Sequence, residues 1–311
     1  MTKRLFKTEA SIIGFLAGST LVLAGILITS YKILLNAVKP KTVEYFKNYH
    51  NEIGYGRFTE EEFHQLDKEE FNIKSSQGYN IHGYFFDNRS SKTIIIIHGI
   101  TMNLWSSVKY MKMFMNKGFN VCIYDQRNHG LSGGEFTSLG AYEREDVVTV
   151  VGFVKNKVGK DSIVGVHGES MGAATGMMAV GICDDIDFLI EDCGYSSIYE
   201  ELKVRLKADH QLPSIPFLYV ANVLMKLFYG FDSNKESPKK AIAESNTPTL
   251  FIHGGKDAYV PTYMAYDLYN SYNGPKELRI FEDSRHAASY VDYVEEYEKV
   301  VYSFLENYSF I

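Results

Sequence analysis

The sequence predicts an α/β domain in which helices cover both faces of a mostly parallel central sheet, joined to an N-terminal transmembrane helix. Continuous apolar runs such as residues 93–97 (TIIII) are typical of strands buried on both faces of a parallel sheet. Between such runs, apolar residues recur at helical spacing, as valines do between residues 147 and 158. Strands that alternate with helices in this way form right-handed crossovers, which place helices on both faces. A charge-free stretch at residues 12–28 predicts the membrane helix.

Length and composition exclude several classes of protein. At 311 residues the chain suits one large α/β domain with an insertion, and 45% hydrophobic with 23% charged residues is ordinary globular composition. The 38 acidic and 32 basic residues give a net charge of −6, which disfavours nucleic-acid binding. The three cysteines are widely spaced, and no histidine–carboxylate cluster has metal-ligand spacing. We therefore expect no nucleic-acid partner, no metal and no cofactor.

The N-terminal apolar run has the features of an uncleaved signal anchor. Residues 12–28 would span roughly 26 Å as a helix, slightly less than a hydrocarbon core of about 30 Å. Lys3, Arg4 and Lys7 precede the run, as they would precede a signal peptide, but the run is longer than a usual signal-peptide core. A cleaved signal peptide and a buried core helix are the less favoured alternatives.

The positive-inside rule favours neither orientation of the anchor clearly, because three basic residues precede the apolar run and three lysines follow it. The short N-terminal tail favours a cytoplasmic N-terminus with the main domain outside the cell membrane. We assign residues 1–31 to the tail and anchor, residues 32–67 to a linker with short helices, and residues 68–311 to the main domain.

The main domain contains one predicted insertion. Within the linker, Thr59 and Glu62 have the spacing of a capping box, which predicts a helix start. A turn at residues 77–80 predicts a hairpin at the start of the main domain. Residues 198–246 contain helical stretches but no convincing strand, as a lid inserted above a sheet edge would.

A candidate nucleophile follows one of the buried strands. Ser170 lies in the sequence GESMG, between a strand and a helix. Gly168 and Gly172 are needed on either side because the serine turns sharply and side chains there would strike the neighbouring strand or helix. The serine Oγ is then exposed at a helix N-terminus, where the helix dipole favours a developing negative charge. A glycine-rich turn that merely carries a serine is the less favoured interpretation.

A nucleophilic serine needs a base and a carboxylate that orients the base. Asp257 and His286 follow the last two predicted strands, so the chain order is Ser, Asp, His, which is the order that this turn type uses. The parallel strands end at one edge of the sheet, and the three side chains can converge there. Asp192 also follows a strand and is a rival for the acid role, with helix capping as its other interpretation. We favour Asp257.

The loop after the first buried parallel strand predicts an oxyanion hole. Gly99 would let the backbone turn its N–H groups inward, so that the N–H groups of Ile100 and Met171 hold the tetrahedral oxyanion. Loss of one such donor typically costs about 10²–10³ in turnover. Three histidines that precede a glycine at strand ends are assigned structural roles: His98, His167 and His253.

Residues 68–308 resemble the α/β-hydrolase superfamily, and most of all its bacterial serine aminopeptidase-like, acylglycerol-lipase-like and cinnamoyl-esterase-like branch, in which several members carry a membrane anchor. In that family the loop of residues 124–134 is structural and lies beside the active site. The resemblance therefore implies that Asp125, Arg127 and His129 support the site without taking part in the chemistry. The segments that carry the resemblance are HGITMN (98–103), YDQRNHGLSGG (124–134), GESMG (168–172), GGKDAYVP (254–261) and His286.

The insertion and the anchor together suggest an apolar substrate. Our hypothesis is a hydrolase of carboxylic esters or thioesters that acts through an acyl-enzyme on Ser170, with a small-molecule or lipid-like ester as its substrate. We expect the apolar residues of the insertion to grip the acyl group, although they would equally serve to bury the lid on the core. These residues are Phe217, Leu218, Tyr219, Leu224, Leu227 and Phe228.

Two other functions stay open at this point. A serine peptidase acting on short peptides is the nearest alternative, and the acidic pair Glu200 and Glu201 at the start of the lid gives it some support. A catalytically silent, membrane-anchored binding module is the second alternative. The presence of a serine, an aspartate and a histidine in the expected order argues against it.

Overall fold

The sheet of this protein is mostly parallel, as predicted. The computed structural model describes the backbone of residues 2–311 and the side chains of residues 18–311. Eight strands follow the order β1-β2-β4-β3-β5-β6-β7-β8; β2 pairs antiparallel with β1 and with β4, and all other neighbours are parallel. The strands are β1 (Lys68–Lys74), β2 (Asn80–Phe86), β3 (Lys92–Ile97), β4 (Asn120–Tyr124), β5 (Ile163–Glu169), β6 (Phe188–Asp192), β7 (Thr249–Gly254) and β8 (Lys276–Phe281).

Helices cover both faces of this sheet. Successive side chains of a strand point to opposite faces, so Ile94 and Ile96 pack under α4 and α12 while Ile95 and Ile97 pack under α5 and α6. The continuous apolar run of β3 follows from this double burial. The helices are α1 (Thr2–Val38), α2 (Tyr45–Gly54), α3 (Glu60–Gln65), the 3-10 turn η1 (Leu104–Ser107), α4 (Val108–Met115), α5 (Glu143–Val158), α6 (Met171–Val180), α7 (Ile198–His210), α8 (Ser214–Tyr229), α9 (Pro238–Ala243), α10 (Tyr263–Ser271), α11 (Ser289–Asp292) and α12 (Val294–Asn307).

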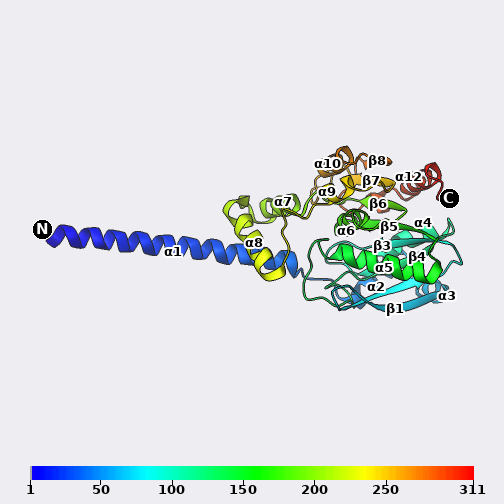
Figure 1. Cartoon of the computed structure of the whole chain (residues 1–311), viewed down its shortest axis with the longest axis horizontal. Helices are drawn as coiled ribbons and strands as arrows, with labels where there is room; N and C mark the ends of the chain where they lie inside the picture. Colours follow the sequence, from blue (N-terminus) through cyan, green and yellow to red (C-terminus); the bar gives the residue numbers. More distant parts are fainter. Residues whose placement is uncertain (1) are drawn as a thin grey trace.

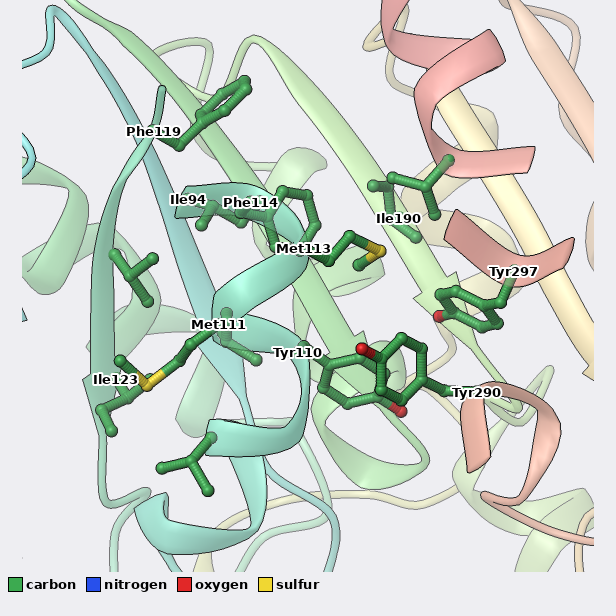
Figure 2. Packing of buried hydrophobic residues seen from close by; sticks show 14 of the residues in the cluster. Ile94, Tyr110, Met111, Met113, Phe114, Phe119, Ile123, Ile190, Tyr290 and Tyr297 are labelled. Atoms are coloured by element: carbon green, nitrogen blue, oxygen red, sulfur yellow. The ribbon is translucent and has the colours of Figure 1, made fainter. Parts of the chain in front are cut away.

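The packing of α4 illustrates how the core is filled. Figure 2 shows Met111 and Phe114 of α4 directed toward the strand residues Ile123 and Ile94, all of which are buried. Methionine adapts its shape to irregular gaps, and the aromatic ring buries a large apolar area. The resulting layer fixes β3 and β4, whose carboxyl ends carry two of the loops described below.

The N-terminal helix continues past residue 31, where the predicted linker begins, and ends at Val38. Among the described residues, one helical stretch, Gly18–Val38, is long and apolar enough to span a membrane, with a mean hydropathy of 1.9. It overlaps the predicted span, although residues 12–17 of that prediction lie outside the residues whose side chains are described. Leu34 and Val38 are buried in the domain, which explains why the helix extends beyond the predicted anchor.

The capping box predicted at Thr59 and Glu62 is present at the start of α3.

The insertion between β6 and β7 contains α7, α8 and α9. α9 packs against α6 and α10 and therefore belongs to the helical layer on the sheet. The cap that stands apart from the sheet consists of α7 and α8. In Figure 1 the cap lies at the end of the domain from which α1 projects, and the C-terminus lies at the other end.

Candidate active site

Ser170 occupies a strained turn between β5 and α6. Its φ of 56° and ψ of −116° fall where residues with a side chain are rarely found, and such strain is typical of functional positions. A Cβ on Gly168 would lie 2.3 Å from the carbonyl oxygen of Gly172, and a Cβ on Gly172 would lie 2.2 Å from that of Ile97. Both glycines are therefore needed for the close approach of backbone that the sequence predicts.

Three predicted residues from different strand ends meet at this turn. The Oγ of Ser170 lies 2.9 Å from Nε2 of His286, and Nδ1 of the same histidine lies 2.7 Å from Oδ2 of Asp257. The distances fit a serine hydroxyl that donates to Nε2 and an Nδ1–H that donates to the carboxylate. Ser170 follows β5, Asp257 follows β7 and His286 follows β8, so the parallel strands deliver all three side chains to one edge of the sheet.

Asp257 is held as a carboxylate. Its Oδ1 accepts the backbone N–H groups of Tyr259 (2.8 Å) and Val260 (2.9 Å), and its Oδ2 lies 3.3 Å from Nε2 of His253. Burial opposes ionisation, but the hydrogen bonds from His253 and His286 outweigh it and lower the pKa of Asp257 to about 2. The carboxylate is therefore charged at neutral pH, and His253 has the supporting position predicted for it.

Asp192, the rival acid, belongs to a different network. Its Oδ2 accepts hydrogen bonds from the hydroxyl groups of Tyr297 (3.0 Å) and Tyr110 (3.3 Å), and burial raises its pKa to about 6. The hydroxyl of Tyr297 also lies 2.9 Å from Nε2 of His167, which is the structural histidine predicted at the end of β5. The helix-capping interpretation of Asp192 is wrong, because Ser197 caps the next helix.

Ile100 and Met171 are the two residues whose backbone N–H groups are predicted to form the oxyanion hole. Both residues line the same cavity as the serine, and within residues 18–311 neither N–H donates to a protein acceptor. The expected need for Gly99 is wrong, since a Cβ there would make ordinary contacts at 3.5 Å and the left-handed backbone of this loop falls on Thr101 (φ 67°).

Two neutral histidines brace the loop that carries Ile100. Nδ1 of His98 faces the carbonyl oxygen of Gly99 (2.8 Å), and its Nε2 accepts the N–H of Gln126 (3.0 Å). Nδ1 of His129 likewise faces the carbonyl of Arg127 (2.9 Å), and its Nε2 accepts the N–H of Thr101 (3.3 Å). Burial lowers the pKa of His98 to about 3 and also lowers that of His129. Both rings therefore carry their proton on Nδ1. In each ring Nδ1–H donates to a carbonyl oxygen and Nε2 accepts a backbone N–H, which holds the loop in place.

Comparison with known proteins agrees with this geometry. Residues 92–186 match the family model of the alpha/beta hydrolase fold. The Bacillus subtilis protein YqkD is 42% identical over 291 residues, which cover 93% of this chain and 94% of that protein. The chain belongs to the α/β-hydrolase family. The α/β-hydrolase domain-containing protein WAV2 of Arabidopsis thaliana is 26% identical over 258 residues, covering 76% of this chain and 78% of WAV2. The Pyrococcus furiosus esterase Pf2001 superposes with a TM-score of 0.64 at 25% identity, covering 78% of this chain and 93% of the esterase.

Asp125 and Arg127 hold the loop of residues 124–134 beside the site of this α/β hydrolase. Within the described residues, neither one is hydrogen-bonded to Ser170, Asp257 or His286. Asp125 accepts the N–H groups of Leu104 (2.8 Å) and Leu131 (2.9 Å), and its Oδ2 lies 3.0 Å from Nδ1 of His82. The guanidinium of Arg127 lies 4.4 Å from the ring centroid of Phe136. Sequence reasoning missed His82, which lies on β2 far from the recognisable motifs.

The cavity above Ser170 is built differently from the prediction. It has a volume of about 160 Å³, and the cap lines it with α7 alone, through residues such as Leu202 and Leu206. None of the six apolar residues predicted on residues 217–228 lines it. Tyr219, Leu227 and Phe228 are exposed on the outer face of α8. The other three pack into the core, as the alternative interpretation expects: Phe217, Leu218 and Leu224. Ile33, Asn36 and Ala37 of α1 line the cavity instead. No sequence pattern indicates this contact, since all three residues lie in the predicted linker of residues 32–67.

Glu201 of α7 stands in the wall of this cavity without a partner. Its side chain is 6% exposed, and neither carboxyl oxygen has a hydrogen-bond partner. Burial raises the pKa of Glu201 to about 8. At neutral pH the cavity therefore presents a protonated, unpaired carboxyl group, which is a costly arrangement that a ligand would relieve.

Cys193 completes a cluster with Asp257 and His286, whose ligand atoms lie within 4.8 Å of one another. Metal binding needs a thiolate, but burial raises the pKa of the Cys193 thiol well above its ordinary value. The other two side chains are hydrogen-bonded to each other. The chemistry of the three groups therefore favours the hydrogen-bonded triad over a metal site.

Proposed function

We propose that this protein is a serine hydrolase that cleaves carboxylic esters or thioesters through an acyl-enzyme on Ser170. The observation that carries the proposal is the continuous hydrogen-bonded chain from Ser170 through His286 to Asp257 at the floor of a cavity. A nucleophile, a base within hydrogen-bond reach and an ionised carboxylate behind the base are the groups that acyl transfer requires.

The reaction follows from the positions of these groups. His286 takes the hydroxyl proton as Oγ of Ser170 attacks the acyl carbon, and Asp257 stabilises the resulting imidazolium. The N–H groups of Ile100 and Met171 then donate to the tetrahedral oxyanion. When the intermediate collapses, His286 gives its proton to the leaving alcohol or thiol. Water attacks the acyl-enzyme by the same route and regenerates the serine.

The size of the cavity favours a short acyl or small aromatic group. Its volume of about 160 Å³ is close to the roughly 150 Å³ of an engineered apolar cavity that binds benzene. Leu139, Leu202 and Leu206 supply apolar walls. We therefore expect turnover to fall as the acyl chain outgrows this space.

We also propose that α1 anchors the enzyme in the cell membrane with its hydrolase domain outside the cell. The support is the apolar helix and the basic residues Lys3, Arg4 and Lys7 that precede the apolar run. Protease added to intact cells should then remove the domain. Protection of the domain until the membrane is permeabilised would contradict this orientation.

The test of the function uses the full chain in detergent with p-nitrophenyl esters of increasing acyl length. Ser170→Ala should lower kcat by at least about 10³, whereas Ser303→Ala on the exposed face of α12 serves as the matched control. Both variants should retain the melting temperature of the parent. Ester turnover that survives in Ser170→Ala would contradict the proposal.

A serine peptidase is the second candidate, and Glu201 is the observation that favours it. A carboxyl group without a partner in the cavity wall would bind the free amino group of a short peptide and become ionised by it. Aminoacyl p-nitroanilides with a free amino group should then be cleaved faster than their acetylated forms, and Glu201→Gln should remove the difference. A folded protein that cleaves neither esters nor anilides would favour the binding-module alternative.

A further inference from the structure

One face of the cap helix α8 is apolar and open to solvent. Tyr219, Val223 and Leu227 are spaced by four residues, and each is between 46% and 72% exposed. Residues at this spacing lie above one another on one helix face. The opposite face, with Leu218 among its residues, is buried in the domain. Contiguous apolar surface of this kind marks a site of contact with another apolar phase.

The same surface continues onto the N-terminal helix. α1 packs along α8, as Figure 1 also shows, and an apolar groove runs between the two helices. On the α1 side, Leu27 and Ile28 are themselves at least half exposed. Lys32 is the single charged residue in the lining of the groove. The apolar lining consists of Leu27, Ile28, Tyr31, Leu35, Leu224 and Phe228.

We propose that the outward face of α8 lies in the interface of a lipid bilayer, so that the cap and the N-terminal helix enter the membrane together. The occupant is lipid, because the exposed stripe is continuous with a helix that is long and apolar enough to span the membrane. α8 carries one charged residue, Lys226, whose Nζ is paired with Asp232 at 2.7 Å. Tyr31 and Tyr219 are exposed aromatic residues of the type that is enriched at membrane interfaces.

This position brings the cavity close to the bilayer. Ile33 lines the cavity and lies five residues beyond Ile28, which corresponds to about 8 Å along the helix. An ester dissolved in the membrane would then reach Ser170 without crossing bulk water. That consequence rests on the proposed function, whereas the position of α8 does not.

The test places spin labels on the full chain reconstituted in vesicles of phosphatidylcholine and phosphatidylglycerol. Tyr219→Cys and Leu227→Cys report on α8, and Ile182→Cys, which is exposed after α6, is the matched control. The native cysteines are all buried, and the unsubstituted chain measures any background labelling. Collision rates are measured with molecular oxygen, which concentrates in lipid, and with a water-soluble nickel chelate.

The proposal predicts that labels at positions 219 and 227 collide several-fold more often with oxygen than with the nickel chelate, while the label at position 182 shows the reverse. Nickel accessibility at 219 and 227 equal to that at 182 would overturn it, because the face would then be in water. Low accessibility to both reagents would also overturn it, because a second copy or another protein would cover the face. Neither result depends on activity, so the test stands apart from that of the proposed function.

Discussion

Ser170, Asp257 and His286 form a site at the carboxyl ends of the strands, which we call the strand-end site. This site and the cap differ in how many of their polar and apolar groups find partners within the chain. At the strand ends, Asp257, His286 and the two loop histidines are all engaged in hydrogen bonds. In the cap, the carboxyl group of Glu201 has no partner, and one face of α8 is bare apolar surface. The site is therefore fixed by the fold itself, whereas we propose that contacts outside the chain complete the cap, with substrate on one side and lipid on the other.

The largest effect is expected when the two buried aspartates near the strand ends, Asp257 and Asp192, are each replaced by asparagine in separate variants. Asp257→Asn should lower kcat on p-nitrophenyl esters by about 10⁴, because the amide no longer fixes the Nδ1–H tautomer of His286 or stabilises its charged form. Asp192→Asn is the matched control and should change kcat less than tenfold, since its carboxylate pairs with tyrosines. A larger loss from Asp192→Asn would reverse the assignment of the acid.

The close packing of the serine turn predicts the next effect. Gly172→Ala would place a methyl group 2.2 Å from the carbonyl oxygen of Ile97, and should cost on the order of 3 kcal/mol of unfolding free energy. Gly152→Ala, inside α5 with open space around it, should instead gain up to about 1 kcal/mol. Thermal unfolding measures both variants. Equal stability of the two variants would mean that the serine turn has room for a methyl group at position 172.

The unpaired carboxyl group of the cap should appear in the pH dependence of stability. The folded pKa of Glu201 is raised from 4.5 to about 8, so folding favours its protonated form and stability falls as the pH rises from about 4.5 to about 8. Glu201→Gln removes this loss and should gain on the order of 5 kcal/mol relative to the parent between pH 4 and pH 9. Glu200→Gln on the same helical turn is the control. Parallel pH profiles of the parent and Glu201→Gln would contradict the assignment.

The smallest expected effect concerns His129, which holds the loop that carries Ile100. His129→Ala removes the acceptor for the N–H of Thr101 and should lower kcat about tenfold with little change in KM, because a loosened loop weakens donors that act in the transition state. His50→Ala on the exposed side of α2 should leave both constants unchanged. A rise in KM alone would instead assign His129 to substrate binding.

The sequence predicts the strand-end site well because its determinants are local. Continuous apolar runs identify strands buried on both faces, and the glycines around Ser170 report a backbone contact that tolerates no side chain. Parallel strands that end at one edge then bring Asp257 and His286 to the serine. The exception within this region is the loop at Gly99, where the left-handed residue is Thr101.

The cap could not be predicted in the same way, because helical spacing shows that a face is apolar but not what it contacts. The pattern of α8 fits a grip on the acyl group and burial of the lid on the core equally well, and the structure buries Leu218 in the core and turns Tyr219 and Leu227 outward. Likewise, burial of Glu201 and the approach of Ile33 to the cavity depend on how α7 and α1 pack against distant segments.

Covalent labelling shows directly whether Ser170 is the nucleophile. The full chain is treated with a fluorophosphonate, which reacts with activated serines, and the modified residue is identified by mass spectrometry. We expect one adduct, on Ser170, which is absent in Ser170→Ala and forms much more slowly in His286→Ala. A folded protein that is not labelled, or that is labelled at another serine, would show that Ser170 is not the nucleophile.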